Sequence, residues 1–535
     1  MIPYTLIYEG VPETFNVCYY HLDHWVNKGY GDRQAVIDIG LRKTYTYNEL
    51  LELTCKISNI LKTEDLDLGD RVAIVARDNV TGIAAFLAAV RIGMVPFFIN
   101  PNYDAEEISY YLADSRARII FTDKSCISKI QTIKTGIGIK LVKKTYIFDS
   151  PEFRARLYNT ASWAPLEEVH KDDPAYWVYT SGTTDKPKAA VHLHHDLPYS
   201  VYPYIINVTP IEVDSLFYSA SKLYFSAGRM FGLHIPLMTG SCTLIDPERS
   251  DPDRVLDNLT SFDVTHFLAV PTLYLKLIMR IKMRGAENVR FKKLKYCIAG
   301  GEQLPATVFE RWREITGIEI YNGIGSSEAE WIYISYLPER AKPGAAGQPI
   351  PMWNVKLVDD KGEDITTSGV VGTLYLRGES VSPFYWHRRD DTKRYIVGEW
   401  FNTKDKLYFD HDGYFYYVGR IDDVFKIHGM WISPLEIEEV ILKTGLVSEC
   451  AVTHIATPPE DLNIMVAFVV PKNQQQHQLL NELKDKISGF LPPFKIPKHF
   501  LIIDEIPRTA TGKIKRAILK EMAKSRLIQN ANTQI

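Results

Sequence analysis

The sequence predicts a multi-domain α/β protein: a large N-terminal domain of two doubly wound sheets plus a small β-barrel, followed by a smaller α+β C-terminal domain. At 535 residues the chain is longer than the roughly 250 to 300 residues at which one hydrophobic core stops growing. Apolar strand-like segments alternate with helical patterns over two long stretches, which is typical of parallel sheets. Short glycine-punctuated segments then replace the helical pattern between residues 347 and 418.

Each predicted sheet follows from its own run of segments. The first run contains strands at 71–76, 95–99 and 118–122, separated by helices at 81–92 and 105–114. The second run contains strands at 242–245, 266–269, 296–299 and 319–322, with helices near 253–259, after Pro271 and from Pro305. Two parallel layers are therefore expected.

The remaining segments predict two smaller lobes. Alternating segments at 355–360, 372–378 and 413–419 indicate a small barrel or antiparallel sheet. After residue 420 the pattern changes to a helix near 434–442, strands at 450–455 and 465–470, a helix from 478 to 490 and a lysine-rich tail. We place the main boundary within 419–424, which gives domains 1–420 and 421–535.

Composition disfavours several classes of function. The net charge of -3 arises from 62 basic and 65 acidic residues mixed along the chain, so neither nucleic acid nor anionic lipid is expected as a partner. Arg91 and Pro96 interrupt the most apolar stretch, which predicts no membrane span. The N-terminus lacks a secretory signal, which favours a cytoplasmic location. The six cysteines form no CxxC pair and are expected as core thiols.

The strongest local motif is YTSGTTDKPKAAVH at residues 179–192, where an apolar strand runs into a polar loop. The Gly182 backbone, the hydroxyls of this loop and the cation of Lys188 can together hold a polyphosphate. The Walker pattern GxxxxGK[ST] is absent, so a P-loop ATPase is disfavoured. A polar turn after a strand is the structural alternative.

The string TSGTTxxPK resembles the phosphate-loop signature of the adenylate-forming superfamily, which includes acyl-CoA synthetases, luciferases and adenylation domains. Further matches follow in the family's order: CIAGGEQLP at 297–305, YNGIGSSE at 321–328, NTKDK at 402–406, GRIDD at 419–423 and PRTATGK at 507–513. The resemblance covers about residues 45–520. Asp185 and Ala189 stand where the family has glycine, and Ser327 replaces the usual threonine.

The resemblance implies ATP as a substrate. Asn322 would lie at the adenine edge, Asp405 at the ribose diol, and Arg420 at ribose and phosphate oxygens. The whole expected ATP-binding set is Thr180, Ser181, Gly182, Thr183, Thr184, Lys188, Gly301, Glu302, Gln303, Asn322, Gly323, Ile324, Gly325, Ser326, Ser327, Asp405, Arg420 and Lys513.

The resemblance also implies catalytic roles and a moving C-terminal domain. Lys513, Glu328 and Lys188 are the expected catalytic residues, with Glu328 binding Mg2+. The C-terminal domain would rotate about Asp422 between adenylation and transfer to coenzyme A. That rotation would bring in the coenzyme A residues, which are expected to be Gly429, Met430 and Trp431.

The acyl pocket is expected between residues 221–232 and 329–336. Phe225, Ser226, Ala227 and Trp331 would face the acid, or Phe225 and Trp331 are core aromatics. Resemblance is greatest to benzoate-CoA ligases, then to medium-chain acyl-CoA synthetases. The predicted function is therefore an AMP-forming carboxylate-CoA ligase, acting on an aryl or a short to medium-chain acid.

Two alternatives stay open: an enzyme that loads a carrier protein, and a non-catalytic nucleotide-binding regulator. The presence of Lys513 and Glu328 argues against the regulator. The expected partners are a small carboxylic acid and, as a candidate, a second copy of the chain. His192, His194 and His195 show no carboxylate or cysteine partner in the sequence, so we interpret them as a helix-start cluster rather than a metal site.

Overall fold

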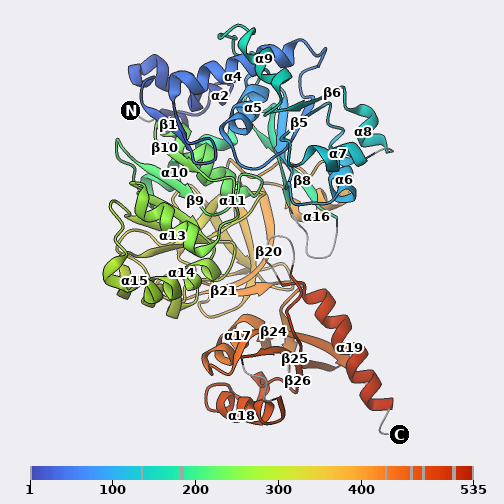
Figure 1. The fold of residues 1–535 in the computed structure, drawn as a ribbon. Coiled ribbons are helices and arrows are strands. Elements are labelled where there is room, and N and C mark those ends of the chain that lie inside the picture. The colour runs from blue at the N-terminus through green and yellow to red at the C-terminus, as the bar shows by residue number, and fades with distance from the viewer. Residues whose placement is uncertain are drawn as a thin grey trace. The chain divides into compact units, whose positions relative to one another are not determined.

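The computed structural model describes residues 3–133, 136–180, 186–427, 430–457, 462–472, 476–508 and 514–532 (Figure 1). Two compact units divide the chain. The first contains Met1–Thr180, Pro187–Asn354 and Arg377–Phe401, and the second contains Ser181–Lys186, Val355–Leu376 and Asn402–Ile535. The predicted boundary within 419–424 lies inside the second unit and stays a prediction.

The first unit contains a four-stranded parallel sheet in the order β4-β3-β5-β6. Its strands are β3 (Arg71–Val75), β4 (Val95–Phe98), β5 (Ile119–Thr122) and β6 (Lys144–Ile147). Helices α5 (Val80–Arg91) and α6 (Ala105–Ser115) connect them. Asn79 begins α5 by accepting from the Gly82 N–H, and Asp104 with Glu107 forms a capping box on α6. The predicted alternation of strands and helices is confirmed here.

A nine-stranded sheet forms the second layer, in the order β15-β14-β13-β12-β11-β9-β10-β1-β2. Every pairing from β13 to β1 is parallel, and the edge pairs are antiparallel. Helix α14 lies between α13 and α15 (Figure 1). The strands are β1 (Gln34–Asp38), β2 (Lys43–Thr46), β9 (Leu216–Ser219), β10 (Cys242–Ile245), β11 (His266–Ala269), β12 (Tyr296–Gly300), β13 (Ile320–Gly325), β14 (Ile332–Ser335) and β15 (Gln348–Pro349).

Further helices complete the first unit. They are α1 (Thr5–Tyr8), α2 (Cys18–His21), α3 (Asp23–Trp25), η1 (Val26–Tyr30), α4 (Tyr47–Lys62), α7 (Ile127–Thr132), α8 (Ile137–Leu141), α9 (Pro151–Tyr158), α10 (Asp196–Asn207), α11 (Ser226–Arg229), η2 (Met230–His234), α12 (Ile235–Met238), α13 (Pro252–Ser261), α14 (Pro271–Arg284), η3 (Ala286–Asn288), α15 (Ala306–Thr316) and α16 (Arg389–Tyr395).

A two-stranded ribbon of β7 (Pro174–Thr180) and β8 (Lys188–Leu193) packs on the four-stranded sheet. Trp177 of β7 and Val191 of β8 belong to the same apolar core as strands β3, β4 and β5. Residues 382–386 run along β8 and pair with it: the Val191 N–H donates to the Phe384 carbonyl, and the Trp386 N–H donates to the Ala189 carbonyl. This pairing brings the 382–386 segment to the strand that follows the predicted phosphate loop.

The predicted small β lobe is an open half-barrel in the order β17-β16-β18-β20-β19, with β21 also pairing with β20. Most of its residues belong to the second unit, whereas β19 belongs to the first. Its strands are β16 (Asn354–Val358), β17 (Asp364–Ile365), β18 (Gly372–Arg377), β19 (Ile396–Val397), β20 (Trp400–Phe409) and β21 (Phe415–Arg420). The pairing of Asp405 with Arg420 lies at the junction of β20 and β21.

The C-terminal elements of the second unit form a three-stranded sheet covered on both faces. Helices α17 and α18 pack against side chains such as Val452 and Ala467, whereas α19 packs against their sequence neighbours Ala451 and Phe468 on the opposite face (Figure 1). Alternation along the strands therefore supplies both cores. The predicted lysine-rich tail is helix α19. The elements are β22 (Phe425–Ile427), β23 (Met430–Ile432), α17 (Pro434–Lys443), β24 (Val447–Thr457), β25 (Leu462–Pro471), α18 (Gln476–Ser488), η4 (Pro493–Lys495), β26 (His499–Ile502) and α19 (Arg516–Asn532).

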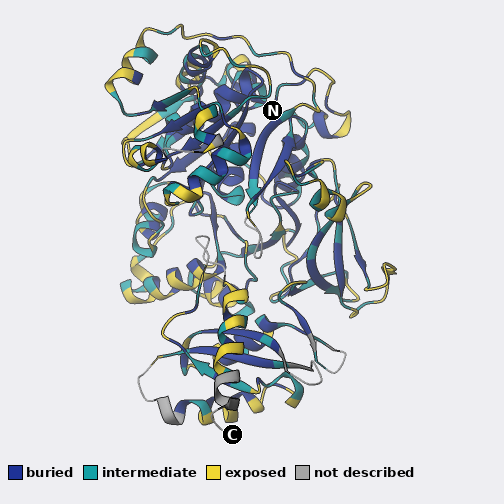
Figure 2. Ribbon diagram, turned by 90° about the vertical axis from the view of Figure 1, so that its right-hand side faces the viewer, coloured by how far each residue is buried: buried dark blue, intermediate teal, exposed yellow. Residues whose placement is uncertain are grey.

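Burial follows the sheets. Figure 2 colours most of their strands as buried, while exposed residues gather on helices and loops. All six cysteines are buried free thiols, as the sequence predicted. In the described part of the chain, none of the helices reaches the length and hydropathy that crossing a bilayer requires.

Candidate active site

The carboxyl ends of strands β12 and β13 bring two predicted nucleotide segments together. Gly300 pairs with Gly323, so the residues after Gly300 lie beside the 322–325 segment. Gly301 has a φ of +84°, which a side chain rarely adopts. A Cβ at Gly325 would stand 2.6 Å from the backbone carbonyl of Trp331. Glycine is therefore required both after β12, at Gly301, and at the end of β13, at Gly325.

Asn322 is buried and already uses part of its amide. Its Nδ2 donates to the carbonyl of Ala345 at 3.1 Å. Glu302, on the neighbouring strand end, accepts from the Thr272 N–H at the start of α14 at 3.4 Å. Gln303 follows Glu302 in the same loop. These contacts hold the carboxyl ends of β12 and β13, where the sequence predicts that the adenine binds.

The turn after β13 carries Ser326, Ser327 and Glu328, all half-buried. Oε1 of Glu328 accepts from the Tyr385 hydroxyl at 2.7 Å, and its backbone carbonyl accepts from the Ser382 N–H at 2.7 Å. Both partners belong to the segment that runs along β8. The sequence had not singled out Tyr385, because no local pattern connects it with Glu328.

Glu328 fits the expected Mg2+. Among the described residues, its second carboxylate oxygen Oε2 has no hydrogen-bond partner, so one hard oxygen ligand is available. Elsewhere in the described ranges, His, Cys, Asp and Glu side chains form no group of three arranged to hold a metal ion. A cation at Glu328 would share its coordination with phosphate oxygens and water.

Lys188 begins β8, opposite Thr180 at the end of β7. Its Nζ lies 2.8 Å from Oδ2 of Asp391 on α16, and both side chains are largely buried. Asp391 is a second neighbour that the sequence did not reveal. The other predicted phosphate-loop residues, Ser181, Gly182, Thr183 and Thr184, lie outside the described residues.

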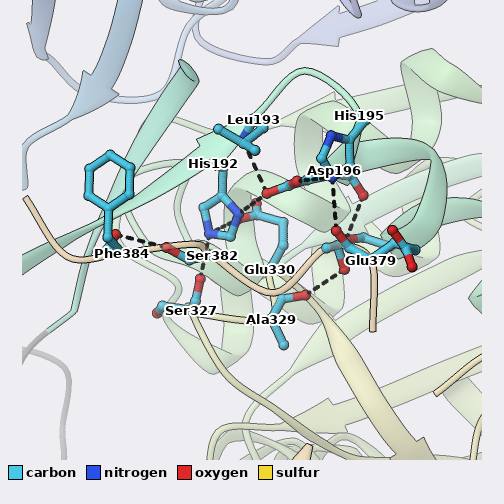
Figure 3. A network of polar contacts seen from close by, with 12 residues as sticks. His192, Leu193, His195, Asp196, Ser327, Ala329, Glu330, Glu379, Ser382 and Phe384 are labelled. Carbon is cyan, nitrogen blue, oxygen red and sulfur yellow. Dashed lines mark hydrogen bonds and ion pairs between the residues drawn. The ribbon is translucent and has the colours of Figure 1, made fainter. Parts of the chain in front are cut away.

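Four side chains form a buried ionic cluster at the 326–330 turn, and Figure 3 shows three of them, His192, Asp196 and Glu330. Oδ2 of Asp196 lies 2.7 Å from His192 Nδ1, and the Ser327 carbonyl lies 2.8 Å from His192 Nε2. Oε2 of Glu330 makes an ionic contact with the same Nε2 at 3.2 Å. Oε1 of Glu330 lies 2.7 Å from Arg229 Nη2. The buried ionic cluster comprises His192, Asp196, Arg229 and Glu330, each at most 2% exposed.

This arrangement corrects part of the interpretation of the histidines. His195 directly precedes helix α10, as predicted, but its ring contacts the carboxylates of Asp172 and Asp196 at 2.9 and 3.3 Å. His192 is a strand residue of β8 rather than a helix-start residue, and it has two carboxylate partners. The sequence hid the second partner because Glu330 lies on a distant segment. His194 differs: its Nδ1 accepts from the Val17 N–H at 3.2 Å, and burial lowers its pKa to about 3.

The protonation of His192 is governed by burial and by its carboxylate neighbours. Burial by itself would lower the pKa of His192. The charges of Glu330 and Asp196, with the hydrogen bonds to Asp196 and to the Ser327 carbonyl, outweigh burial and raise the pKa above its usual 6.5. The imidazolium form is therefore favoured near neutral pH.

The predicted acyl residues lie next to the buried ionic cluster. Ser226 Oγ donates to the Glu330 carbonyl at 3.4 Å, and Phe225 and Ala227 beside it are half-buried. Trp331 is 3% exposed. Its ring meets Tyr204 edge to face at 5.4 Å and stacks on Phe231 at 6.1 Å. Within the described residues, the indole N–H of Trp331 has no hydrogen-bond partner.

The second unit carries the remaining predicted residues. Arg420 Nη1 lies 3.3 Å from Oδ1 of Asp405, whose side chain is 8% exposed. Asp422 is exposed in the turn after β21. Trp431 lies on β23 beneath the ammonium of Lys406, 4.7 Å from the ring centre. Met430 begins the same strand, while Gly429 and Lys513 lie outside the described residues.

Two family models match the chain. The model described as AMP-binding enzyme matches residues 22–386, and the model described as AMP-binding enzyme C-terminal domain matches residues 436–513. The first model includes the described residues of the candidate site in the first unit except Asp391.

Individual proteins are similar over nearly the whole chain. The 4-hydroxybenzoate–CoA/benzoate–CoA ligase of Rhodopseudomonas palustris is 32% identical over 95% of this chain and 94% of its own length. A mitochondrial acyl-coenzyme A synthetase of Mus musculus is 29% identical over 96% of this chain and 91% of its own length. The solved anthranilate CoA ligase in complex with anthranoyl-AMP has a TM-score of 0.88 at 26% identity, covering 96% of this chain and 98% of its own.

Proposed function

This chain belongs to the AMP-binding enzyme family and is an AMP-forming acid–thiol ligase, and from that premise we propose that its acid is a small aromatic carboxylic acid related to benzoate. ATP and coenzyme A are the other substrates. The acid leaves as its CoA thioester, with AMP and diphosphate as the other products.

The aromatic surroundings of Trp331 are the observation that carries the choice of acid. Trp331 contacts both Tyr204 and Phe231, and it follows Glu330, whose carbonyl contacts the half-buried Ser226. Aromatic rings favour offset and edge-to-face partners, so a benzoate-like ring suits this wall better than an alkyl chain. Similarity to a hydroxybenzoate and benzoate ligase over 95% of the chain supports the same class.

The indole N–H of Trp331, which has no partner among the described residues, narrows the proposed class of acid further. A buried donor without an acceptor costs free energy, and an oxygen substituent on the acid would supply that acceptor. We therefore infer that a hydroxybenzoate is used at least as well as benzoate itself.

In the first half-reaction, a carboxylate oxygen of the acid attacks the α-phosphorus of ATP and the bond to diphosphate breaks. Lys188 offsets the charge that develops on the phosphates, and Lys513 approaches the carboxylate and the α-phosphate. Mg2+ bound at Glu328 would neutralise phosphate charge. Gly301 and Asn322 would position the adenine ring at the β12 and β13 edge.

In the second half-reaction, the thiolate of coenzyme A attacks the acyl carbon and the bond to AMP breaks. Lys513 must leave the acyl group for this step. We propose that the C-terminal elements turn about Asp422, which lies exposed in the turn between β21 and β22, and that Gly429, Met430 and Trp431 then face the pantetheine.

The direct test measures AMP and CoA thioester formation with ATP, Mg2+ and coenzyme A over a panel of acids. Benzoate, 3- and 4-hydroxybenzoate, anthranilate, hexanoate and octanoate distinguish the classes. We expect CoA-dependent turnover with the aryl acids and at least about tenfold lower kcat/KM with the fatty acids. Preference for octanoate would overturn the aryl assignment, and AMP release without any thioester would point to a carrier-protein acceptor.

A further inference from the structure

The buried ionic cluster connects two parts of the candidate site that lie far apart in the sequence. Strand β8 begins at Lys188 and carries His192 four residues later, and alternate strand residues share one face. His192 contacts the carbonyl of Ser327, next to Glu328. One strand therefore bears the phosphate-side cation and also holds the turn that carries the metal-binding carboxylate.

Geometry fixes the charge state of His192. Among the described residues, Nδ1 contacts Asp196, and Nε2 contacts the Ser327 carbonyl and Glu330, so both ring nitrogens face acceptors (Figure 3). A neutral imidazole has one N–H and would set a lone pair against an acceptor. An imidazolium donates on both sides. Arg229 pairs with Glu330, whereas the Asp196 carboxylate contacts His192 and also His195, whose Nε2 lies 3.3 Å from Asp196 Oδ1. A charged His192 ring between Asp196 and Glu330 therefore lowers the cost of burying both carboxylates.

The turn is held from a second side by Arg229. Glu330 has a φ of +68°, a left-handed conformation that is uncommon for a residue with a side chain. Its carboxylate is locked by Arg229, whose guanidinium lies over the Tyr176 ring at 5.3 Å. That ring in turn stacks on His192 at 5.4 Å. The unusual backbone at Glu330 therefore coincides with a fully buried ion pair.

We propose that His192 is a positioning residue for nucleotide binding: as an imidazolium between Asp196 and Glu330, it holds the 326–330 turn so that Glu328 and Ser327 meet the metal–phosphate group. The proposal rests on the nucleotide part of the proposed function and is independent of the acid. Partners that orient a metal ligand typically change metal affinity or activity by about 10- to 100-fold when they are removed.

The experiment is a calorimetric titration of the full chain with ATP, in the presence and in the absence of Mg2+, and without acid or coenzyme A. In His192→Gln, the buried ionic cluster loses one positive charge, and the 326–330 turn loses the contacts of the imidazolium with the Ser327 carbonyl and Glu330. We expect MgATP binding to weaken by at least about tenfold, with a much smaller change for ATP without Mg2+. Equal weakening of both titrations, or no weakening, would overturn the proposal.

A rescue variant separates positioning from general damage. His192→Gln combined with Asp196→Asn removes one charge of each sign and restores neutrality, so we expect MgATP affinity to recover to within about threefold of the natural chain. His266→Gln is the matched control, because His266 is equally buried on β11 but does not contact the turn. Its MgATP affinity should not change even if its melting temperature falls.

The outcomes distinguish failure of this proposal from failure of the proposed function. Equal losses in the His192 and His266 variants, or no recovery in the double variant, would contradict a positioning role. If His192→Gln does not fold, Glu330→Gln tests the same contact between His192 and the turn. Unchanged MgATP affinity in Glu330→Gln would overturn the proposal. A chain that turns over no aryl acid but shows the MgATP pattern would refute the acid class alone.

Discussion

The hydroxyl of Tyr385 donates to Oε1 of Glu328 at 2.7 Å and leaves the second carboxylate oxygen without a partner among the described residues. Tyr385 reaches this position because its segment pairs with strand β8 through Ala190. The carboxylate is thus oriented by one neighbour and open on one side. This orientation is what a single carboxylate ligand for a phosphate-bound cation requires.

Removal of this hydroxyl should loosen Glu328. In Tyr385→Phe we expect kcat/KM for diphosphate exchange into ATP to fall about tenfold, because a hydrogen bond to a charged group is lost. The Mg2+ concentration for half-maximal exchange should rise. Tyr47→Phe is the matched control, since the buried Tyr47 hydroxyl donates to the distant Ser241 carbonyl. Identical behaviour of the two variants would contradict the role of Tyr385.

The pairing of Lys188 with Asp391 predicts a graded loss. Lys188→Met should reduce diphosphate exchange by at least about 100-fold, because a preorganised positive charge at the phosphates is lost. Asp391→Asn keeps the Lys188 ammonium but no longer orients it, so we expect diphosphate exchange to fall about tenfold. Lys293→Met removes the exposed partner of Asp214 and should leave exchange unchanged. A full rate in Asp391→Asn would show that Asp391 does not orient Lys188.

Lys513 should matter for one half-reaction only. We expect Lys513→Ala to lose acyl-adenylate formation while still converting supplied acyl-adenylate and coenzyme A to the thioester. The physical reason is that its charge is needed while the phosphate charge develops and not while the thiolate attacks. The two rates are measured separately with a chemically prepared adenylate. Equal loss in both steps would refute this division.

The raised pKa of His192 makes a signed prediction about stability. A group whose pKa is higher in the folded chain stabilises fully below its unfolded value, near 6.5, and that stabilisation is lost as pH rises through the folded pKa. The difference in unfolding free energy between the natural chain and His192→Gln should therefore shrink above pH 6.5.

Other buried histidines act in the opposite direction. Burial lowers the pKa of His21 to about 4 and that of His266 to about 3, so their stabilisation is present above 6.5 and is lost as pH falls below it. Urea unfolding of the natural chain and of His192→Gln between pH 6 and 9 cancels histidines that are remote from His192, such as His266. The remaining difference reports His192 together with its neighbours His195 and His234. A difference that grows above pH 6.5 would contradict the protonated state.

The C-terminal core of the second unit contains a buried ion pair with a testable contribution. Arg516 Nη1 lies 2.6 Å from Oε1 of Glu438, with both side chains at most 10% exposed. Arg516→Met leaves a buried carboxylate unpaired and should lower the unfolding free energy by about 3 kcal/mol, while Arg516→Met with Glu438→Leu should recover most of it. Lys524→Met breaks the exposed ion pair with Glu521 and should change the unfolding free energy by less than about 0.5 kcal/mol. Denaturant unfolding followed by circular dichroism measures all three.

Local patterns predicted the ordered motifs and part of the secondary structure, but not strand β9, which lies between β10 and β11 in the nine-stranded sheet. Strands such as β3 and β11 are short apolar runs between turns, and the predicted runs coincide with the observed sheets. The link between Arg229 and Glu330 spans 101 residues, and no repeat or spacing in the sequence indicates it. The left-handed backbone at Glu330 was equally hidden, because a glutamate gives no local signal for it. Tertiary contacts, rather than propensity, decide such positions.

Whether Phe225 and Trp331 face the acid could not be decided from the sequence. A buried aromatic residue satisfies a core and a pocket wall equally well, and its type does not distinguish them. The structure adds a distinguishing feature, the unpartnered N–H of Trp331. Only the acid panel decides whether an oxygen of the substrate meets it.

The six buried cysteines have a consequence for an enzyme that handles an activated acyl group. An acyl-adenylate is a mixed anhydride that acylates any accessible thiolate, and the reaction is intended for one thiol, that of coenzyme A. Burial raises the pKa of Cys18 and Cys297 to about 12, so the chain's own sulfur stays protonated as well as shielded. The chain's own thiols are thereby protected from acylation by this intermediate.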